Sequence, residues 1–156
     1  MIALDLQTFR QSREGGNVTG VIFLELQDGA FPEMGWSDFP VIVLGWWTDS
    51  WLQLEVATRS EIQWRFMDGP HSLTLTKGEG SNSIGAYEFS QVGSSLLEAA
   101  ERVVAHCDKH KMFSNDLELL RSNIQRLQAN KTVQRTGASR SAHIEIRPSV
   151  AAGSRR

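Results

Sequence analysis

Alternation of hydrophobic and polar residues dominates the first 90 residues of the chain and predicts β-strands. Residues 52–56 are the clearest case, because Leu52, Leu54 and Val56 alternate with polar residues and would line one face of a strand. Glycine-rich turn signals separate the alternating segments, as at Asp68-Gly69-Pro70. The predicted strands cover residues 1–9, 18–27, 41–47, 51–57, 61–67 and 71–77, with a seventh candidate at 84–89.

The stretch from Phe31 to Trp51 organises this pattern, since it holds four of the five tryptophans. Residues 41–47 are apolar on both faces of an alternating pattern, which is typical of a strand in the middle of a sheet. We therefore predict a central strand at 41–47, flanked by acidic loops at 33–38 and 48–50. These two loops are where we expect function.

Two predicted strands, at 21–26 and 41–47, carry more apolar residues than one buried face requires. Either the 31–38 loop and the N-terminal strand cover the second face, or that face is an exposed apolar patch. The sequence leaves both arrangements open.

Helical spacing begins only after these strands. Ser95 and Glu98 form a capping-box pattern that predicts a helix start. Ser114 or Asn115, followed by Glu118, predicts a second start a short distance later. Apolar residues then recur three and four positions apart, at Leu96, Leu97, Ala100, Val103, Val104 and Cys107 and again at Leu117, Leu120, Ile124 and Leu127.

Strands followed by helices indicate an α+β fold. We predict an antiparallel meander of about six or seven strands, followed by a C-terminal helical hairpin packed on one face of the sheet. Residues 1–130 would form a single domain. Residues 131–156 lack an amphipathic period and are rich in Arg, Ser, Ala and Gly, so they are predicted to be a disordered basic tail.

The distribution of charge along the chain says more about possible partners than the net charge of −2 does. Residues 1–95 carry 12 acidic against 5 basic side chains, whereas residues 131–156 carry 1 against 6. An acidic body repels a phosphate backbone and attracts a basic partner, so we expect no nucleic-acid partner. The sequence shows neither a membrane-spanning stretch nor a secretory signal, and we expect a cytoplasmic protein without a membrane partner.

Candidate catalytic and metal patterns are incomplete. His106 and His110 have the i, i+4 spacing of a zinc pair, but Cys107 points about 100° away from them on a helix. The glycines at 78, 80 and 85 precede a predicted strand, whereas a phosphate-binding loop precedes a helix. We expect no catalytic residue, metal or cofactor, and we predict that the protein is not an enzyme.

The tryptophans admit three interpretations. They can fill the core, which we favour for Trp46, Trp47 and Trp64. Trp36 and Trp51 could form a ligand cage if their loops converge. Exposed tryptophans ringed by acids could also form a protein interface, and the candidate binding residues are then Glu33, Trp36, Asp38, Trp46, Asp49 and Trp51.

The string Phe31-Pro32-Glu33-x-x-Trp36-x-Asp38-Phe39, its continuation to Trp46-Trp47, and Phe66-Met67-Asp68-Gly69-Pro70 together resemble a motif set of small bacterial α+β proteins of unknown function. Some of those proteins are similar to immunity proteins of toxin systems. The resemblance covers residues 1–130 loosely and transfers no site residues. The segment from Thr132 to Arg140 resembles an extension peptide appended to unrelated bacterial proteins.

Two hypotheses of function follow from the sequence. The first is a protein-binding module without catalytic activity, of the immunity type, that covers a basic toxin or nuclease with an acidic, tryptophan-bearing sheet face. The second is a small-molecule or carbohydrate-binding domain, enzymatic in one version, around Trp36 and Trp51. Homodimerisation through a surplus apolar face is a further alternative.

Overall fold

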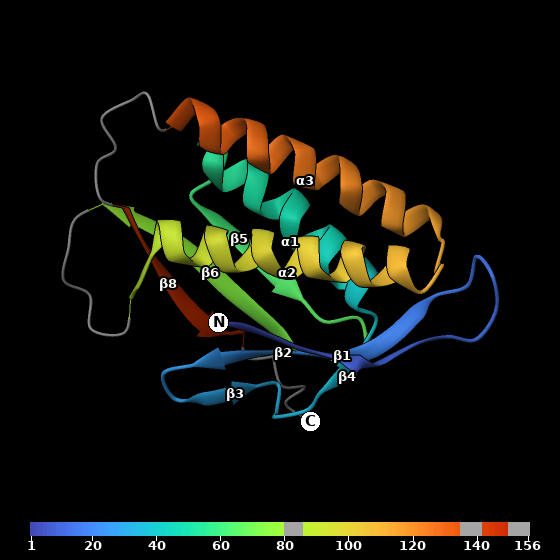
Figure 1. The fold of residues 1–156 in the computed structure, drawn as a ribbon. Helices are drawn as coiled ribbons and strands as arrows, with labels where there is room; N and C mark the ends of the chain where they lie inside the picture. Colours follow the sequence, from blue (N-terminus) through green and yellow to red (C-terminus); the bar gives the residue numbers. More distant parts are fainter. Residues whose placement is uncertain (80–85, 135–141, 150–156) are drawn as a thin grey trace.

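The computed structural model describes residues 1–79, 86–134 and 142–149. Its elements are β1 (Ile2–Gln11), β2 (Val18–Leu26), β3 (Gly29–Phe31), β4 (Ser37–Asp38), α1 (Pro40–Glu55), β5 (Glu61–Arg65), β6 (Ser72–Glu79), β7 (Tyr87–Glu88), α2 (Phe89–Lys109), α3 (Asn115–Gln134) and β8 (Ala142–Pro148). Figure 1 shows their arrangement. Helices and antiparallel strands are both present, which confirms the predicted α+β class.

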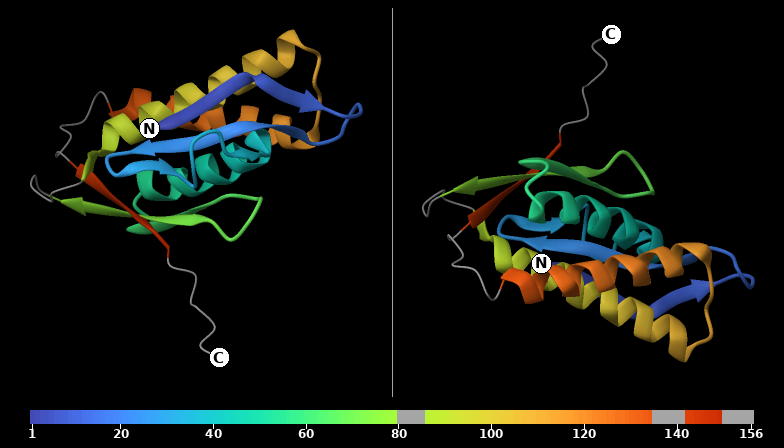
Figure 2. Two further views of the ribbon diagram at one scale, coloured as in Figure 1. Left: turned by 90° about the horizontal axis from the view of Figure 1, so that it is seen from below. Right: turned by 90° about the horizontal axis from the view of Figure 1, so that it is seen from above.

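The described strands form two sheets of four strands each, so the prediction of one meander with six or seven strands is wrong. In sheet A, β1, β2 and β3 pair in sequence order, and β4 also pairs with β2. In sheet B the order is β5-β6-β8-β7. The two sheets lie on opposite sides of α1, which contacts β2 of one and β5 of the other (Figure 2).

The predicted central strand at 41–47 and the predicted strand at 51–57 are both wrong, because residues 40–55 form the single helix α1. Pro40 occupies the first turn of this helix, where its fixed φ and missing N–H are tolerated. The residues between the two expected strands are helical, and their hydroxyls bond to the preceding turn: Thr48 Oγ1 donates to the Leu44 carbonyl at 2.7 Å, and Ser50 Oγ donates to the Trp47 carbonyl at 3.1 Å.

α1 is apolar almost all round because other elements surround it. α3, α2, β5 and β2 all pack against it. A helix that other elements cover on most sides is apolar on most sides, which explains why both faces of the 41–47 pattern are apolar; only its outer side, with Ile42 and Trp46, is partly exposed. Trp47 stacks on Trp64 of β5, with ring centroids 4.8 Å apart and planes at 8°, so the predicted core role of these two rings is confirmed. The same prediction is wrong for Trp46, which is 46% exposed.

The two C-terminal helices are found, but their starts and packing differ from the prediction. α2 begins at Phe89, so Ser95 lies inside it, and its hydroxyl accepts a hydrogen bond from the Ile2 N–H at 3.1 Å. The start of α3 is confirmed, since Ser114 Oγ accepts from the Leu117 N–H. α3 packs more extensively on α1 than on α2, and a hairpin lying on a sheet face is not confirmed.

The prediction of a disordered tail is wrong for residues 142–148, which form β8 between β6 and β7. Ile144 pairs with Lys77 and is fully buried. Residues 131–134 are the last residues of α3. The remaining tail residues, 135–141 and 150–156, lie outside the described part of the chain.

Candidate functional site

Two loops meet where α1 begins, and the carboxylate of Asp38 joins them. Asp38 is buried just before the helix. Its oxygens accept from Trp36 Nε1 at 3.1 Å and from the Phe39 N–H at 2.7 Å on its own side. They also accept from the N–H groups of Met67 at 3.3 Å and Asp68 at 3.1 Å, in the turn between β5 and β6. The carboxylate therefore fixes the β5–β6 turn against the segment that leads into α1.

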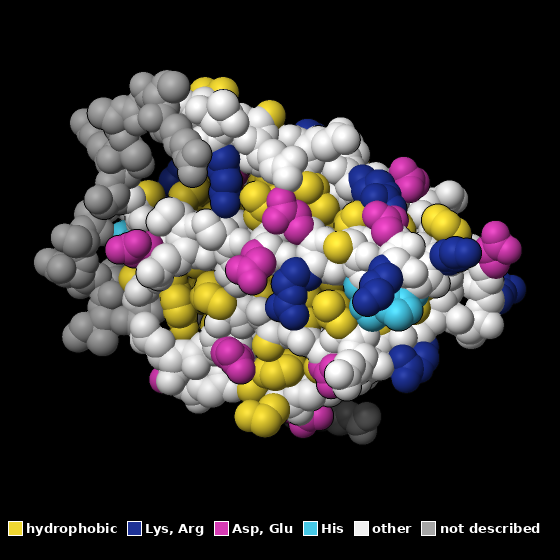
Figure 3. Space-filling view, in the orientation of Figure 1, with side chains coloured by type: hydrophobic (Ala, Val, Ile, Leu, Met, Phe, Trp, Pro, Cys, Tyr) yellow, Lys and Arg dark blue, Asp and Glu magenta, His cyan; other side chains and the backbone are white. Residues whose placement is uncertain are grey.

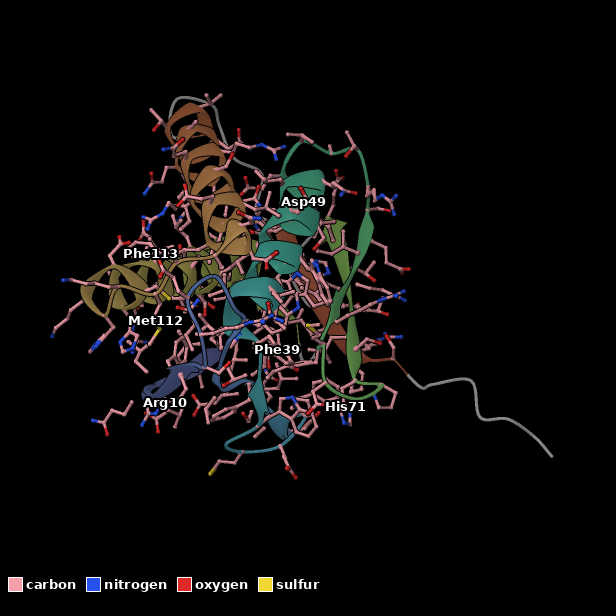
Figure 4. The ribbon with its side chains drawn as sticks, turned by 90° about the vertical axis from the view of Figure 1, so that its right-hand side faces the viewer. Arg10, Phe39, Asp49, His71, Met112 and Phe113 are labelled. Atoms are coloured by element: carbon pink, nitrogen blue, oxygen red, sulfur yellow. The ribbon has the colours of Figure 1, made fainter. Side chains whose placement is uncertain are left out.

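The ring of Trp36 makes a second connection between the same loops. It lies edge-on to His71, with ring centroids 4.9 Å apart, and Phe31 contacts the same imidazole at 6.1 Å (His71 is labelled in Figure 4). Its Cη2 atom lies 3.7 Å from the position that a Cβ would take on Gly69. Gly69 has a φ of +73°, a left-handed conformation that favours glycine. Glycine at position 69 thus allows the β5–β6 turn to lie close to the Trp36 ring.

We call the surface of residues 33–36 and 67–71 the loop platform. Met34 is 81% exposed and Met67 is 43% exposed, while Glu33 and Asp68 are also exposed. Methionine side chains adapt their shape to a partner, and carboxylates attract cationic groups. The platform therefore presents adaptable apolar contacts beside negative charge.

The platform holds two of the predicted site residues, Glu33 and Trp36, and a third, Asp38, supports it from below the surface. Glu33, Trp36 and Asp38 are brought together, with Asp38 acting from within the protein. Met34, Met67, Asp68 and His71 were not among the candidates. The signal for Met67 and Asp68 was the Phe66–Pro70 motif, which the structure places against the Glu33–Asp38 segment.

The other predicted site residues lie on α1 and not in loops. Trp46 and Asp49 are exposed on its outer side, and Asp49 lies 3.8 Å from Arg126 of α3. Trp51 is fully buried: its ring stacks on Phe89 with centroids 4.6 Å apart, and its Nε1 donates to Glu55 Oε1 at 3.0 Å. A surface ligand cannot reach the Trp51 ring, so a cage made by Trp36 and Trp51 has no support in this geometry.

The predicted acidic, tryptophan-bearing sheet face is also wrong in its location. Among the residues that the structure describes, Trp36 lies in a loop and Trp46, Trp47 and Trp51 lie on α1. Trp64 is on β5, but its ring is buried. Acidic side chains beside a partly exposed tryptophan are found instead at the loop platform and on the outer side of α1.

The C-terminal end of α2 is basic and carries the histidine pair. The rings of His106 and His110 lie 4.3 Å apart between centroids, and Phe9 packs edge-on against His106. Burial and the nearby charges of His110, Lys109 and Arg10 lower the pKa of His106. Figure 3 shows histidines beside Lys and Arg side chains in this region. Within residues 1–79, 86–134 and 142–149, no group of three or more His, Cys, Asp or Glu side chains is placed to hold a metal ion.

Cys107 is buried in α2, and burial raises the pKa of its thiol to about 11. The thiolate is the reactive form, so we expect Cys107 to resist alkylation by iodoacetamide at pH 8 in the folded protein and to react readily in denaturant. Mass spectrometry after timed labelling measures this. Rapid labelling of the folded protein would contradict both the burial and the raised pKa.

Two further findings concern membrane insertion and similarity to known proteins. None of the helices in the described part of the chain is both long and apolar enough to cross a membrane. The loop platform and the outer side of α1 are the exposed surfaces on which predicted site residues gather. Comparison with protein-family models, with curated proteins and with solved structures finds no match to this chain.

Proposed function

We propose that this chain is a cytoplasmic, non-catalytic protein-binding module that covers a basic surface of its partner, in the manner of an immunity protein that inhibits a toxin or nuclease. The binding surface in this proposal is the loop platform. The observation that carries it is the buried Asp38 carboxylate, which joins the two loops and holds exposed methionines and acids on one support.

Both the stiffness and the chemistry of the platform support binding. Loops that are fixed before association lose less conformational entropy when a partner docks. Met34 and Met67 offer apolar contact, and Glu33 and Asp68 offer negative charge at the rim, where charge governs the association rate and its salt dependence. Four N–H groups donate hydrogen bonds to the two carboxylate oxygens of Asp38. Because both oxygens already have partners, a structural role suits this carboxylate better than an acid–base role.

The test is salt-dependent association of the purified protein with the products of neighbouring genes. We expect one of them to bind, and to bind more weakly as salt is raised. Reversing two charges with Glu33→Lys and Asp68→Lys should weaken that binding by about tenfold or more, mainly through slower association. Titration calorimetry and stopped-flow mixing measure the two quantities.

The matched control reverses two exposed acids away from the platform, Glu14→Lys in the β1–β2 loop and Glu98→Lys on α2, and so makes the same change in net charge. It should bind nearly as well as the unmodified protein. Equal weakening by both pairs would mean that net charge alone drives the association. If no neighbouring gene product associates in a salt-sensitive manner, the proposal fails.

A further inference from the structure

The outer side of α1 carries a row of residues at the spacing of a helix that packs against another helix. Ile42, Trp46, Asp49 and Gln53, and Val56 directly after the helix, follow one another at alternating steps of four and three. All are at least partly exposed, with Trp46 at 46% and Val56 at 58%. Steps of four and three average 3.5 residues, the repeat at which side chains stay on one seam between packed helices.

α3 runs beside α1 and presents a second row next to the first. Asn123 and Asn130 hold the two helices together: Asn123 Nδ2 donates to the Gly45 carbonyl and to Thr48 Oγ1, and Asn130 Nδ2 donates to Glu55 Oε2. Leu119, Ser122, Arg126 and Ala129 are the exposed residues of α3 at alternating steps of three and four. Figure 4 shows α1 and α3 side by side, with Asp49 labelled on α1. We call these two rows the helical face.

A groove of about 350 Å³ lies on this face between the C-terminal halves of α1 and α3. Its walls are formed by the apolar residues Leu52, Val56 and Ala129 and by the polar residues Asp49, Gln53, Arg126 and Asn130. Trp46 lies on the same face one turn before Asp49, and it is not among the residues that line the groove. The face thus carries both an exposed indole and a groove whose walls are partly apolar and partly polar.

We propose that the helical face binds the same face of a second copy of this chain around a two-fold axis. The axis is perpendicular to α1 and passes between Asp49 and Ser50, so the two α1 helices run antiparallel. Trp46 of one copy then lies opposite Gln53 of the other. Each indole then enters the groove of the opposite copy. A two-fold interface uses the same patch on both subunits, and a patch that holds both the indole and its groove meets this condition.

Charge complementarity also favours a second copy over an unrelated partner. Asp49 and Arg126 lie 3.8 Å apart at the long limit of an ion pair, and both side chains are more than half exposed. A pair so exposed contributes little within one chain. At the two-fold axis the Asp49 and Arg126 side chains of both copies form one cluster of two negative and two positive charges. Each Asp49 there pairs with Arg126 of the other copy, and the exclusion of water around the indole strengthens these pairs.

The experiment separates pairing between copies from pairing within one chain. Asp49→Arg places two positive side chains together, and Arg126→Asp places two negative ones together. Each variant alone should therefore be a monomer in sedimentation equilibrium, whereas the unmodified protein should be a dimer. In an equal mixture, every contact between an Asp49→Arg chain and an Arg126→Asp chain joins opposite charges, although both chains keep a like-charged pair internally. The mixture should therefore form a heterodimer.

Three outcomes would overturn the inference: a monomeric unmodified protein, a mixture of the two variants that stays monomeric, or a folded Trp46→Ser variant that dimerises normally. Trp46→Ser keeps the test decisive if a charge variant fails to fold, because it changes an exposed side chain. The platform variants Glu33→Lys and Asp68→Lys serve as the control and should leave the dimer mass unchanged. The dimer can thus fail or succeed independently of the proposed function.

Discussion

Replacing Trp47 with alanine should lower the free energy of unfolding by about 3–5 kcal/mol, as is usual when a large aromatic side chain is removed from a packed core. Trp47 is fully buried between the helices and sheet B. Its ring stacks on Trp64 and meets the edge of Phe66 at a centroid distance of 5.1 Å. Its Nε1 also donates to the Arg65 carbonyl at 2.9 Å, so the substitution removes a hydrogen bond as well as a large apolar volume. Urea denaturation followed by circular dichroism measures the change.

The next residue toward the N-terminus provides the control for this prediction. Trp46 is exposed on the same helix, and Trp46→Ala should change stability by less than about 1 kcal/mol when the protein is dilute enough to be monomeric. Trp47→Phe should fall between the two, because it keeps a ring for Trp64 but leaves the Arg65 carbonyl without its indole donor. Similar losses for Trp46→Ala and Trp47→Ala would contradict the assignment of residues 40–55 to a buried helix.

The error at this helix has a physical cause. An apolar run of seven residues fits a strand buried on both faces and a helix buried on most sides equally well, because periodicity weakens when most sides are covered. Pro40 was the local signal in favour of the helix, since proline is common at a helix start and rare in a central strand. Thr48 and Ser50 suggested a turn, but their hydroxyls bond within α1.

Alternation predicted the strands at 61–67 and 71–77 well, but the same pattern at 52–56 lies at the C-terminal end of α1. In β5 the buried residues Ile62 and Trp64 alternate with exposed neighbours. β8 has the same kind of alternation in Ile144 and Ile146, but the basic, serine-rich composition around it hid the signal. Its pairing with β6 joins residues far apart in the chain, for example Leu75 with Ile146, and no local pattern encodes such a contact.

Sequence patterns identified the two segments that form the candidate site but not the contacts between them. The 31–39 and 66–70 motifs were both recognised as unusual, and Glu33 and Trp36 were correctly placed in a loop. That Asp38 would bond to Met67 and Asp68 could not be inferred, since about thirty residues separate them and a β-strand and α1 lie between. Asp38 was expected at the surface, and the structure makes it the buried link.

Replacing Asp38 with alanine should therefore destabilise the protein by about 2–4 kcal/mol, because several N–H groups lose their acceptor in a partly buried setting. The loss should be local as well as global. Hydrogen exchange of the Met67 and Asp68 amides should become faster than that of the β5 amides, because the carboxylate is their acceptor while β5 remains paired with β6. Denaturant titration and amide exchange followed by NMR measure the two effects.

Two further substitutions show whether hydrogen bonding or volume is responsible. Asp38→Asn keeps the size of the side chain but turns an amide NH₂ toward at least one N–H donor, so it should lose much of the stability that Asp38→Ala loses. Asp68→Ala removes an exposed carboxylate from the same turn and should leave both stability and amide exchange almost unchanged. If Asp38→Asn were as stable as the unmodified protein, the carboxylate would not be what joins the loops, and the rigidity on which the proposed binding surface depends would need another source.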